Sequence, residues 1–283
     1  MKKTTLKNGN AIPRLGQGGW YIGDNHSTRV EEIEALRRGI DLGMTLIDTA
    51  EMYGSGRSEA LIGEAIAPYN REKLYLVSKV LPNNAGRQSI MKSCEQSLRR
   101  LRTDYLDCYL LHWRGSVPIA ETVECMHELM AKKRIRSFGV SNLDIDDMEE
   151  LFGIPGGSDC VINQVLYHLG SRGVEYDLLP MLKRTDTAMM AYCPLAQSGR
   201  LQKNLLKSNV VRQLAEKNGA TVFQILLAFV LRDKNVIAIP KAASISHVEQ
   251  NFTALSIDLS DEDVAMLSTE FPAPTRKMAL DIQ

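Results

Sequence analysis

Four side chains that can bind or move protons lie at or just after short apolar segments in the first half of the sequence. Asp48 ends the segment Thr45–Asp48, and Tyr53 follows in the next loop. Lys79 ends Leu74–Lys79, and His112 ends Leu106–His112. A cation within hydrogen-bond reach of a phenol favours the phenolate. We therefore expect Lys79, held charged by Asp48, to lower the pKa of Tyr53 from its usual ~10.

A tyrosine activated in this way suits one particular step. It can protonate an oxygen that becomes negative as hydride arrives at its carbon, while a neutral His112 donates to the same oxygen. No side chain supplies hydride, so a nicotinamide cofactor is implied. Taken singly, each residue has an ordinary structural explanation, such as a helix cap, a solvated cation, a hydrogen-bonded histidine or rim packing. Their coincidence behind three successive predicted strands favours a shared site.

The elements that must position these residues alternate along the chain. Eight apolar segments predict strands: Arg14–Gly18, Thr45–Asp48, Leu74–Lys79, Leu106–His112, Ile135–Val140, Val161–Gln164, Ala188–Tyr192 and Val236–Ile239. Helical spacing predicts helices between and after them: Val30–Ile40, Ile90–Leu101, Val210–Lys217, Thr221–Arg232 and Asp261–Thr269, the last capped by Ser260. Strand–helix alternation with eight units predicts the α/β class and a (β/α)8 TIM barrel, with extra helices near the C-terminus.

The N-terminus predicts a β-hairpin. Thr4–Leu6 and Ala11–Ile12 flank a turn that carries Asn8 and Gly9. The alternative to a barrel is a doubly wound open sheet, which expects three glycines in a G-x-G-x-x-G pattern after the first strand. Here Gly16 and Gly18 are followed by Tyr21 at the third position. We therefore expect residues 1–283 to form one barrel domain.

Composition narrows the function classes. The 34 basic and 34 acidic side chains balance, which gives no electrostatic footprint for nucleic acid or an anionic membrane. The five cysteines form no C-x-x-C pair and are expected to be reduced core thiols. The N-terminus does not resemble a signal peptide, so a cytoplasmic location is expected. Asp48 and His112 are too few to build a metal-dependent hydrolase, and no metal is expected.

The chain resembles the aldo-keto reductase family over nearly its whole length. The motifs that carry the resemblance are Leu42–Gly54, Ser97–Asp107, Leu110–Trp113, Gly139–Asn142, Asn163–Gln164, Ala191–Leu195 and Ile239–Lys241. The family's catalytic tetrad matches Asp48, Tyr53, Lys79 and His112. Within the family, Leu166–Pro180 and Ala191–Arg200 are similar to bacterial enzymes that reduce methylglyoxal and other small aldehydes.

The resemblance also implies cofactor contacts and therefore NADPH. Ser141, Asn142 and Gln164 match residues that hold the nicotinamide carboxamide, and Tyr192 matches the residue stacked on its ring. The loop Pro194–Arg200, including Leu195, matches the segment over the pyrophosphate. Lys241 and Ser244 match residues near the adenosine 2′-phosphate, and Asn251 matches one near adenine.

Two positions depart from the family pattern. His247 stands where relatives often carry arginine, and Ala242 where they often carry serine. Arginine offers phosphate a permanent charge and a planar fork, whereas histidine is only partly charged at pH 7. A weaker preference for NADPH is expected, with NADH possible.

The resemblance places Trp20, Tyr21 and Trp113 in an apolar substrate wall, and the short tail Pro272–Gln283 suits a small substrate such as a 2-oxoaldehyde. The expected partner is a small carbonyl compound, with no obligatory protein partner. The alternative is a nicotinamide-binding regulatory module on the same fold, which the complete tetrad disfavours.

Overall fold

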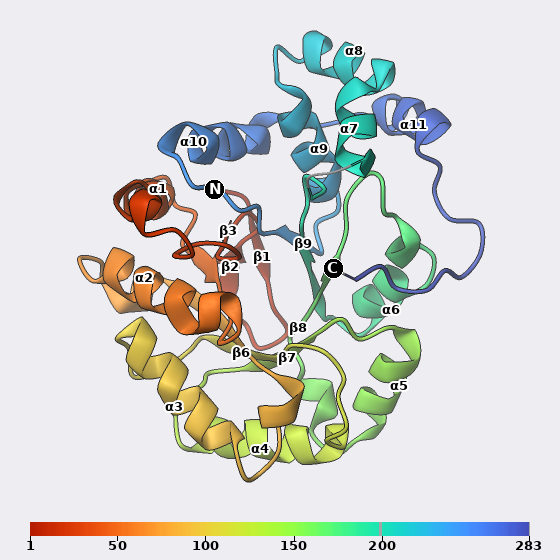
Figure 1. Ribbon diagram of the computed structural model, residues 1–283. Coiled ribbons are helices and arrows are strands. Elements are labelled where there is room, and N and C mark those ends of the chain that lie inside the picture. Colours follow the sequence, from red (N-terminus) through yellow and green to blue (C-terminus); the bar gives the residue numbers. More distant parts are fainter. Residues whose placement is uncertain (198–199, 283) are drawn as a thin grey trace.

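A computed structural model describes residues 1–197 and 200–282. Within them, eight strands form one parallel sheet in which sequential neighbours pair (Figure 1). Its strands are β3 (Gln17–Gly18), β4 (Leu46–Asp48), β5 (Tyr75–Val80), β6 (Cys108–Leu111), β7 (Phe138–Ser141), β8 (Ile162–Leu166), β9 (Ala188–Tyr192) and β10 (Val236–Ala238). Each overlaps one of the eight predicted strands.

The two edges of this sheet meet. Leu15 pairs in parallel with Ala238 of β10, and Gly16 N–H donates to the Ala238 carbonyl at 2.9 Å. The predicted strand Arg14–Gly18 is thus regular over Gln17–Gly18 and joins β10 by a bridge. Gly18 permits the close approach, because a Cβ there would lie 2.6 Å from the Ile239 carbonyl oxygen. The predicted (β/α)8 barrel is confirmed.

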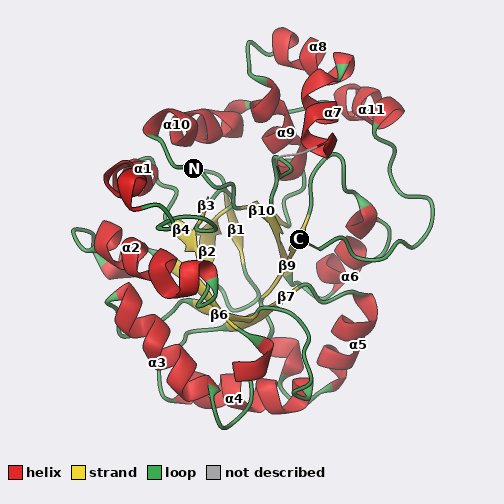
Figure 2. Ribbon diagram, in the orientation of Figure 1, coloured by secondary structure: helices red, strands yellow, loops and turns green. Residues whose placement is uncertain are grey.

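Helices surround the strands in Figure 2. They are α1 (Arg29–Asp41), α2 (Arg57–Ile66), α3 (Ile90–Leu101), α4 (Ile119–Ala131), α5 (Ile145–Gly153), α6 (Leu178–Arg184), α7 (Arg200–Lys207), α8 (Asn209–Lys217), α9 (Val222–Leu231), α10 (Ile245–Thr253) and α11 (Asp261–Glu270). Ser260 caps α11 together with Asp263, as expected. The predicted ranges match α1, α3, α8, α9 and α11, whereas α2, α4, α5, α6, α7 and α10 were given no range from the sequence.

The N-terminal hairpin closes one end of the barrel. Strands β1 (Lys3–Thr5) and β2 (Ala11–Pro13) pair antiparallel, with Thr4 opposite Ile12. Leu6 and Ile12 are buried in the same cluster as inward-facing side chains of the barrel strands. The predicted hairpin is confirmed; β1 lies one residue before its predicted range, and β2 extends one residue beyond its own.

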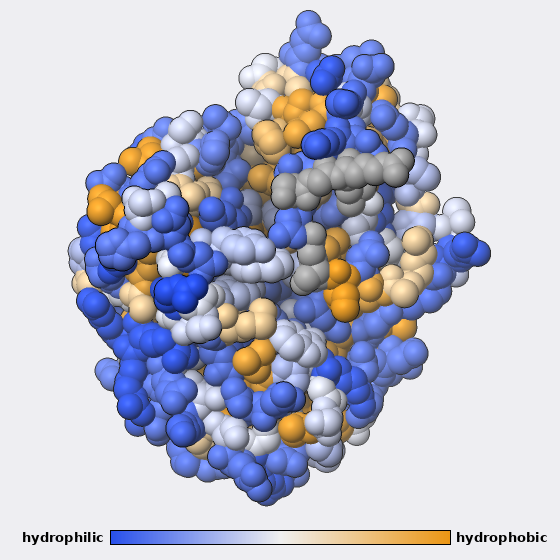
Figure 3. All heavy atoms as spheres, viewed as in Figure 1, coloured by the Kyte–Doolittle hydropathy of each residue, from blue (hydrophilic) through white to orange (hydrophobic). Residues whose placement is uncertain are grey.

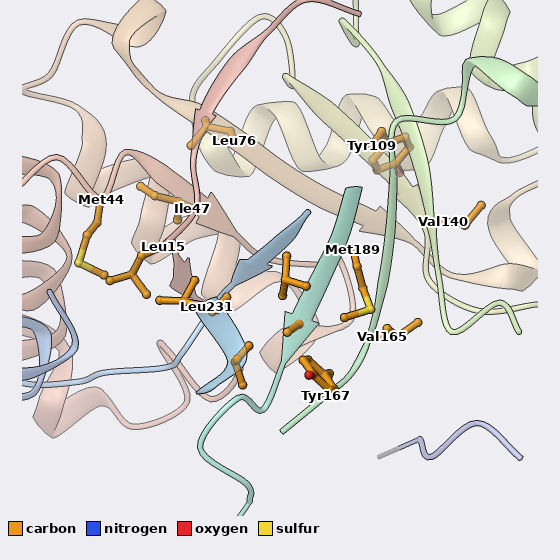
Figure 4. Packing of buried hydrophobic residues seen from close by; sticks show 14 of the residues in the cluster. Leu15, Met44, Ile47, Leu76, Tyr109, Val140, Val165, Tyr167, Met189 and Leu231 are labelled. Carbon is orange, nitrogen blue, oxygen red and sulfur yellow. The ribbon is translucent and has the colours of Figure 1, made fainter. Parts of the chain in front are cut away.

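Alternating side chains divide the core into an inner and an outer layer, as strand geometry requires. On β5, Tyr75 and Val77 belong to the inner cluster, whereas Leu76 and Val80 belong to the outer cluster beneath the helices. Figure 4 shows outer-layer side chains, among them Ile47, Leu76 and Val140. Lys79 therefore falls on an inward position and Ser78 on an outward one.

Across residues 1–197 and 200–282, no single helix is long and apolar enough to cross a membrane; α8 and α9 pass that test only as a pair, bent by 90° at their break.

All five cysteines lie in the described part and are free. Cys94, Cys108, Cys125 and Cys160 are buried, as expected for core thiols, but Cys193 is half-buried.

Candidate active site

Three inward positions at the carboxyl ends of neighbouring strands carry ionisable side chains. Asp48 ends β4, Lys79 lies one residue before the end of β5, and His112 directly follows β6. Tyr53 lies in the loop between β4 and α2, as expected, and begins a short turn there, Tyr53–Gly56. In a barrel of this kind the site forms at the carboxyl ends of the strands. The structure brings all four predicted residues together there.

Lys79 joins two of the others. Its ammonium Nζ donates to Asp48 Oδ2 at 2.8 Å, to the Thr49 carbonyl at 2.8 Å and to Tyr53 Oη at 3.0 Å. These contacts use the three protons that an ammonium group carries. Lys79 is fully buried and Asp48 nearly so. Burial lowers the pKa of Lys79 and raises that of Asp48, and each charge opposes the other's shift.

The expectation that Lys79 lowers the pKa of Tyr53 is wrong for this structure. Burial raises that pKa well above its ordinary value of 10.0, and the charge of Asp48 acts in the same direction. Lys79 does not offset this, because its charge is balanced by Asp48 at 2.8 Å. Tyr53 is consequently a phenol, not a phenolate, at neutral pH, which is the form that can give a proton.

His112 is neutral. Burial, assisted by the positive charge of Lys79, lowers its pKa from 6.5 to about 2. Its ring stands edge-on to Tyr53, with 5.7 Å between centroids. A neutral imidazole carries one N–H and can donate it to an oxygen held beside Tyr53. The lowered pKa agrees with the neutral state expected for His112.

A cavity of about 510 Å³ opens over these residues, and Figure 3 shows this face hollowed near its centre. Of the predicted site residues, those that line it are Trp20, Tyr21, Asp48, Tyr53, His112, Trp113, Ser141, Asn142, Gln164, Tyr192, Pro194, Leu195 and Lys241. Lys79 lies behind Tyr53, with no exposed surface.

Polar groups on β8 and β9 and directly after β7 line the cavity in a connected set. Asn142 Nδ2 donates to the His112 carbonyl at 3.2 Å, and Tyr192 Oη donates to Asn142 Oδ1 at 2.9 Å. Asn142 holds a left-handed backbone, with φ of +57°. Gln164 Nε2 donates to Asp48 Oδ1 at 2.8 Å. The predicted amide-binding group and the proton-donating group are therefore linked through Asp48 and His112.

The residues predicted for the adenosine end lie apart from this cavity, except Lys241. Ser244 caps α10 and accepts from the His247 backbone N–H at 3.4 Å. His247 is exposed, while Asn251 is buried one turn further along. Of the predicted loop Pro194–Arg200, residues 198 and 199 lie outside the described part.

Aromatic rings form one wall of the cavity. Trp20 stacks on Tyr21 at 5.1 Å and on Tyr53 at 6.1 Å between centroids, and Trp113 packs on His112 at 4.8 Å.

Sequence reasoning missed several lining residues, among them Met52, Cys193, Gln202 and Phe223. Met52 and Cys193 each neighbour a predicted site residue, which is a usable signal. Gln202 and Phe223 come from helices α7 and α9, and nothing in their local sequence indicates that these helices reach the cavity.

The C-terminal tail is held away from the cavity. Lys277 Nζ pairs with Asp144 at 2.6 Å and Asp177 at 3.2 Å, beside the starts of α5 and α6. Among the described residues of the tail, 272–282, none lines the cavity. Within that same described chain, no group of three or more His, Cys, Asp or Glu is arranged to hold a metal ion.

Comparison with known proteins agrees with this geometry. The sequence model of the aldo/keto reductase family matches residues 14–269. Methylglyoxal reductase YeaE of Escherichia coli is 54% identical over 272 residues, which span 96% of this chain and 95% of that protein. Glyoxal reductase of Bacillus subtilis is 31% identical over 92% of this chain and 89% of its own. The crystal structure of a Klebsiella pneumoniae aldo-keto reductase in complex with NADPH superposes with a TM-score of 0.97, at 51% identity, over all of both chains.

Proposed function

We propose that this chain, which belongs to the aldo/keto reductase family, reduces small aldehydes and ketones with NADPH. Its substrates include 2-oxoaldehydes such as methylglyoxal, and Tyr53 is the proton donor. One observation carries the proposal: Tyr53 lines the cavity, and Lys79 Nζ, which donates to Tyr53 Oη at 3.0 Å, is paired with Asp48. The identity of 54% to a methylglyoxal reductase supports the substrate class.

The residues present fit a nicotinamide dinucleotide phosphate. Asn142, Gln164, Tyr192 and Lys241 all line the cavity. Beyond Lys241, helix α10 starts at the Ser244 cap, and a helix start with its free N–H groups favours an anion. Ser141, Asn142, Gln164 and Tyr192 would hold the nicotinamide, and Pro194 and Leu195 would line the path of the pyrophosphate. Lys241, Ser244, His247 and Asn251 would face the adenosine phosphate end.

Bound NADPH supplies the hydride. The carbonyl oxygen of the substrate then becomes an alkoxide, which is more basic than a phenolate, so Tyr53 can protonate it despite the raised pKa of its phenol. Lys79 stabilises the phenolate that remains, because its ammonium group already donates to Tyr53 Oη. Neutral His112 donates to the same oxygen and fixes its orientation. Trp20, Tyr21 and Trp113 give this end of the cavity an aromatic lining.

The test is NADPH oxidation, followed by absorbance, with methylglyoxal and a panel of aldehydes. Tyr53→Phe keeps the ring and its stacking but removes the proton. We expect it to lower kcat by at least about 100-fold while NADPH binding, measured by fluorescence quenching, is retained. Turnover that survives in Tyr53→Phe would remove the proton-donor assignment. If the wild-type protein binds NADPH but does not oxidise it with any of the carbonyl compounds, a regulatory module is favoured instead.

A further inference from the structure

A second buried carboxylate lies close behind the catalytic group, on the outer face of the barrel. Glu59 is the third residue of α2, and it has no exposed surface. The reaction proposed above does not use it. An ionised side chain is very seldom buried completely unless partners compensate for the lost water.

The partners of Glu59 come from two other elements. Oε1 accepts from Ser78 Oγ of β5 at 2.6 Å, and Oε2 accepts from Arg100 Nε of α3 at 2.6 Å. Ser78 directly precedes Lys79 but points outward, toward α2, because side chains alternate along a strand. Glu59 thus ties α2 to the strand position next to Lys79.

The same carboxylate acts on the turn that carries Tyr53. That turn ends at Gly56, which has φ of +91°. A Cβ on Gly56 would lie 2.6 Å from Arg100 Cδ, so the Arg100 side chain lies against the backbone of the turn. Glu59 holds Arg100 in that place through its ion pair.

The residue before Glu59 makes a parallel connection. Ser58 Oγ donates to the Gly19 carbonyl at 2.8 Å and lies 2.9 Å from Thr49 Oγ1. The Thr49 carbonyl, in turn, accepts from Lys79 Nζ at 2.8 Å. The first turn of α2 therefore contacts the surroundings of Lys79 from two directions, and Tyr53 lies four residues before that helix.

We propose that Glu59 is a positioning residue, which acts through α2 and β5 to hold Tyr53 Oη within hydrogen-bond distance of Lys79 Nζ. The inference rests on the proposed reductase function, because it assigns Glu59 a part in proton transfer by Tyr53. The charge of Glu59 supports it: burial lowers the pKa of Lys79, and Glu59 adds to the opposing effect of Asp48.

The decisive variant is Glu59→Gln, which keeps the size of the side chain. Its amide can accept from Ser78 but presents N–H to the Arg100 guanidinium, so two donors face each other. We expect kcat to fall by about 10- to 100-fold, the loss that displaced catalytic groups typically cause, with the KM and Kd of NADPH within about twofold of wild type. An unchanged kcat overturns the proposal.

The double variant Glu59→Gln, Arg100→Gln distinguishes a loss of positioning from a general destabilisation of the protein. The amide introduced in α3 can accept from the amide introduced in α2, which restores a bond between the two helices without charge. We expect the double variant to recover most of the lost kcat. A double variant no better than Glu59→Gln, at equal thermal stability, contradicts a positioning role. Ser78→Ala removes a single hydroxyl and provides a mild variant, which we expect to lower kcat in the same direction but less.

Asp107→Asn is the matched control. Asp107 is also buried and also bonded to β5, where it accepts from the Leu76 N–H at 2.9 Å and pairs with Arg71 at 2.7 Å, but at the amino end of the strand. We expect Asp107→Asn to lower stability and to leave kcat unchanged. A fall in kcat equal to that of Glu59→Gln would show that any buried pair has this effect and would overturn the proposal.

A measurement that does not depend on turnover tests the role of Glu59 separately from the proposed reductase function. A crystal structure of Glu59→Gln is expected to show Tyr53 Oη beyond hydrogen-bond distance of Lys79 Nζ. A separation unchanged from 3.0 Å overturns the inference whether or not the wild-type protein reduces methylglyoxal.

Discussion

Gln164 on β8 donates to Asp48 on β4 across the barrel at 2.8 Å, although these strands are not neighbours in the sheet. Gln164 binds Asp48 Oδ1 while Lys79 binds Oδ2, so both oxygens of the buried carboxylate are used. The Asp48 side chain thereby fixes Lys79, which lies behind Tyr53. It also fixes the Gln164 amide, which is proposed to face the nicotinamide. Asp48 is the common support of the two halves of the site.

Asp48→Asn should therefore damage stability as well as turnover. The substitution leaves the Lys79 ammonium buried without its counter-charge, and breaking a buried pair in this way costs about 3–5 kcal/mol. Urea unfolding followed by circular dichroism measures this loss. Burial already lowers the pKa of Lys79, and loss of the Asp48 charge lowers it further. A neutral Lys79 stabilises the Tyr53 phenolate less, so we also expect kcat to fall. A variant as stable as wild type would mean that Lys79 is neutral in the native protein.

The barrel and the four central residues could be predicted because they depend on local pattern. Apolar strands alternate with helices along the sequence. Asp48, Lys79 and His112 each end one of the predicted strands. The pKa of Tyr53 could not be predicted from the sequence, because it depends on how completely the folded chain removes water from the phenol. Glu59 gave no signal either, because a glutamate in the first turn of a helix is ordinarily a solvated residue that favours the helix dipole.

His112 should make the native state more sensitive to acid. Its pKa is about 2 in the folded protein and near 6.5 when unfolded, so the unfolded chain binds one more proton between those values. Stability due to neutral His112 is complete above pH 6.5 and is lost as pH falls below it, by about 1.4 kcal/mol per pH unit. His112→Asn should flatten this slope in urea unfolding between pH 6.5 and 5. His168, whose pKa burial lowers to about 4, contributes a similar slope in both proteins. Identical slopes for wild type and variant would contradict the neutral assignment.

Lys277→Ala tests the position of the tail. The ion pairs of Lys277 with Asp144 and Asp177 are partly exposed, and pairs of this kind contribute about 0–1 kcal/mol. Because the described tail does not line the cavity, kcat/KM for methylglyoxal and larger aldehydes should stay within about twofold of wild type. Trp20→Ala, which does change the lining, serves as the positive control and should raise KM. A selectivity change in Lys277→Ala comparable to that of Trp20→Ala would show that the tail shapes the substrate site.

His247→Arg should tighten NADPH binding more than NADH binding. His247 is exposed in the first turn of α10, beside the Ser244 cap, where the helix start already favours an anion. Arginine adds a permanent charge and a planar fork for the 2′-phosphate, which NADH lacks. Fluorescence titration with both cofactors gives the two Kd values, and Ser158→Arg, which adds the same charge in an exposed turn before β8, controls for net charge. Equal changes for NADPH and NADH, or an equal effect of Ser158→Arg, would place the phosphate away from His247.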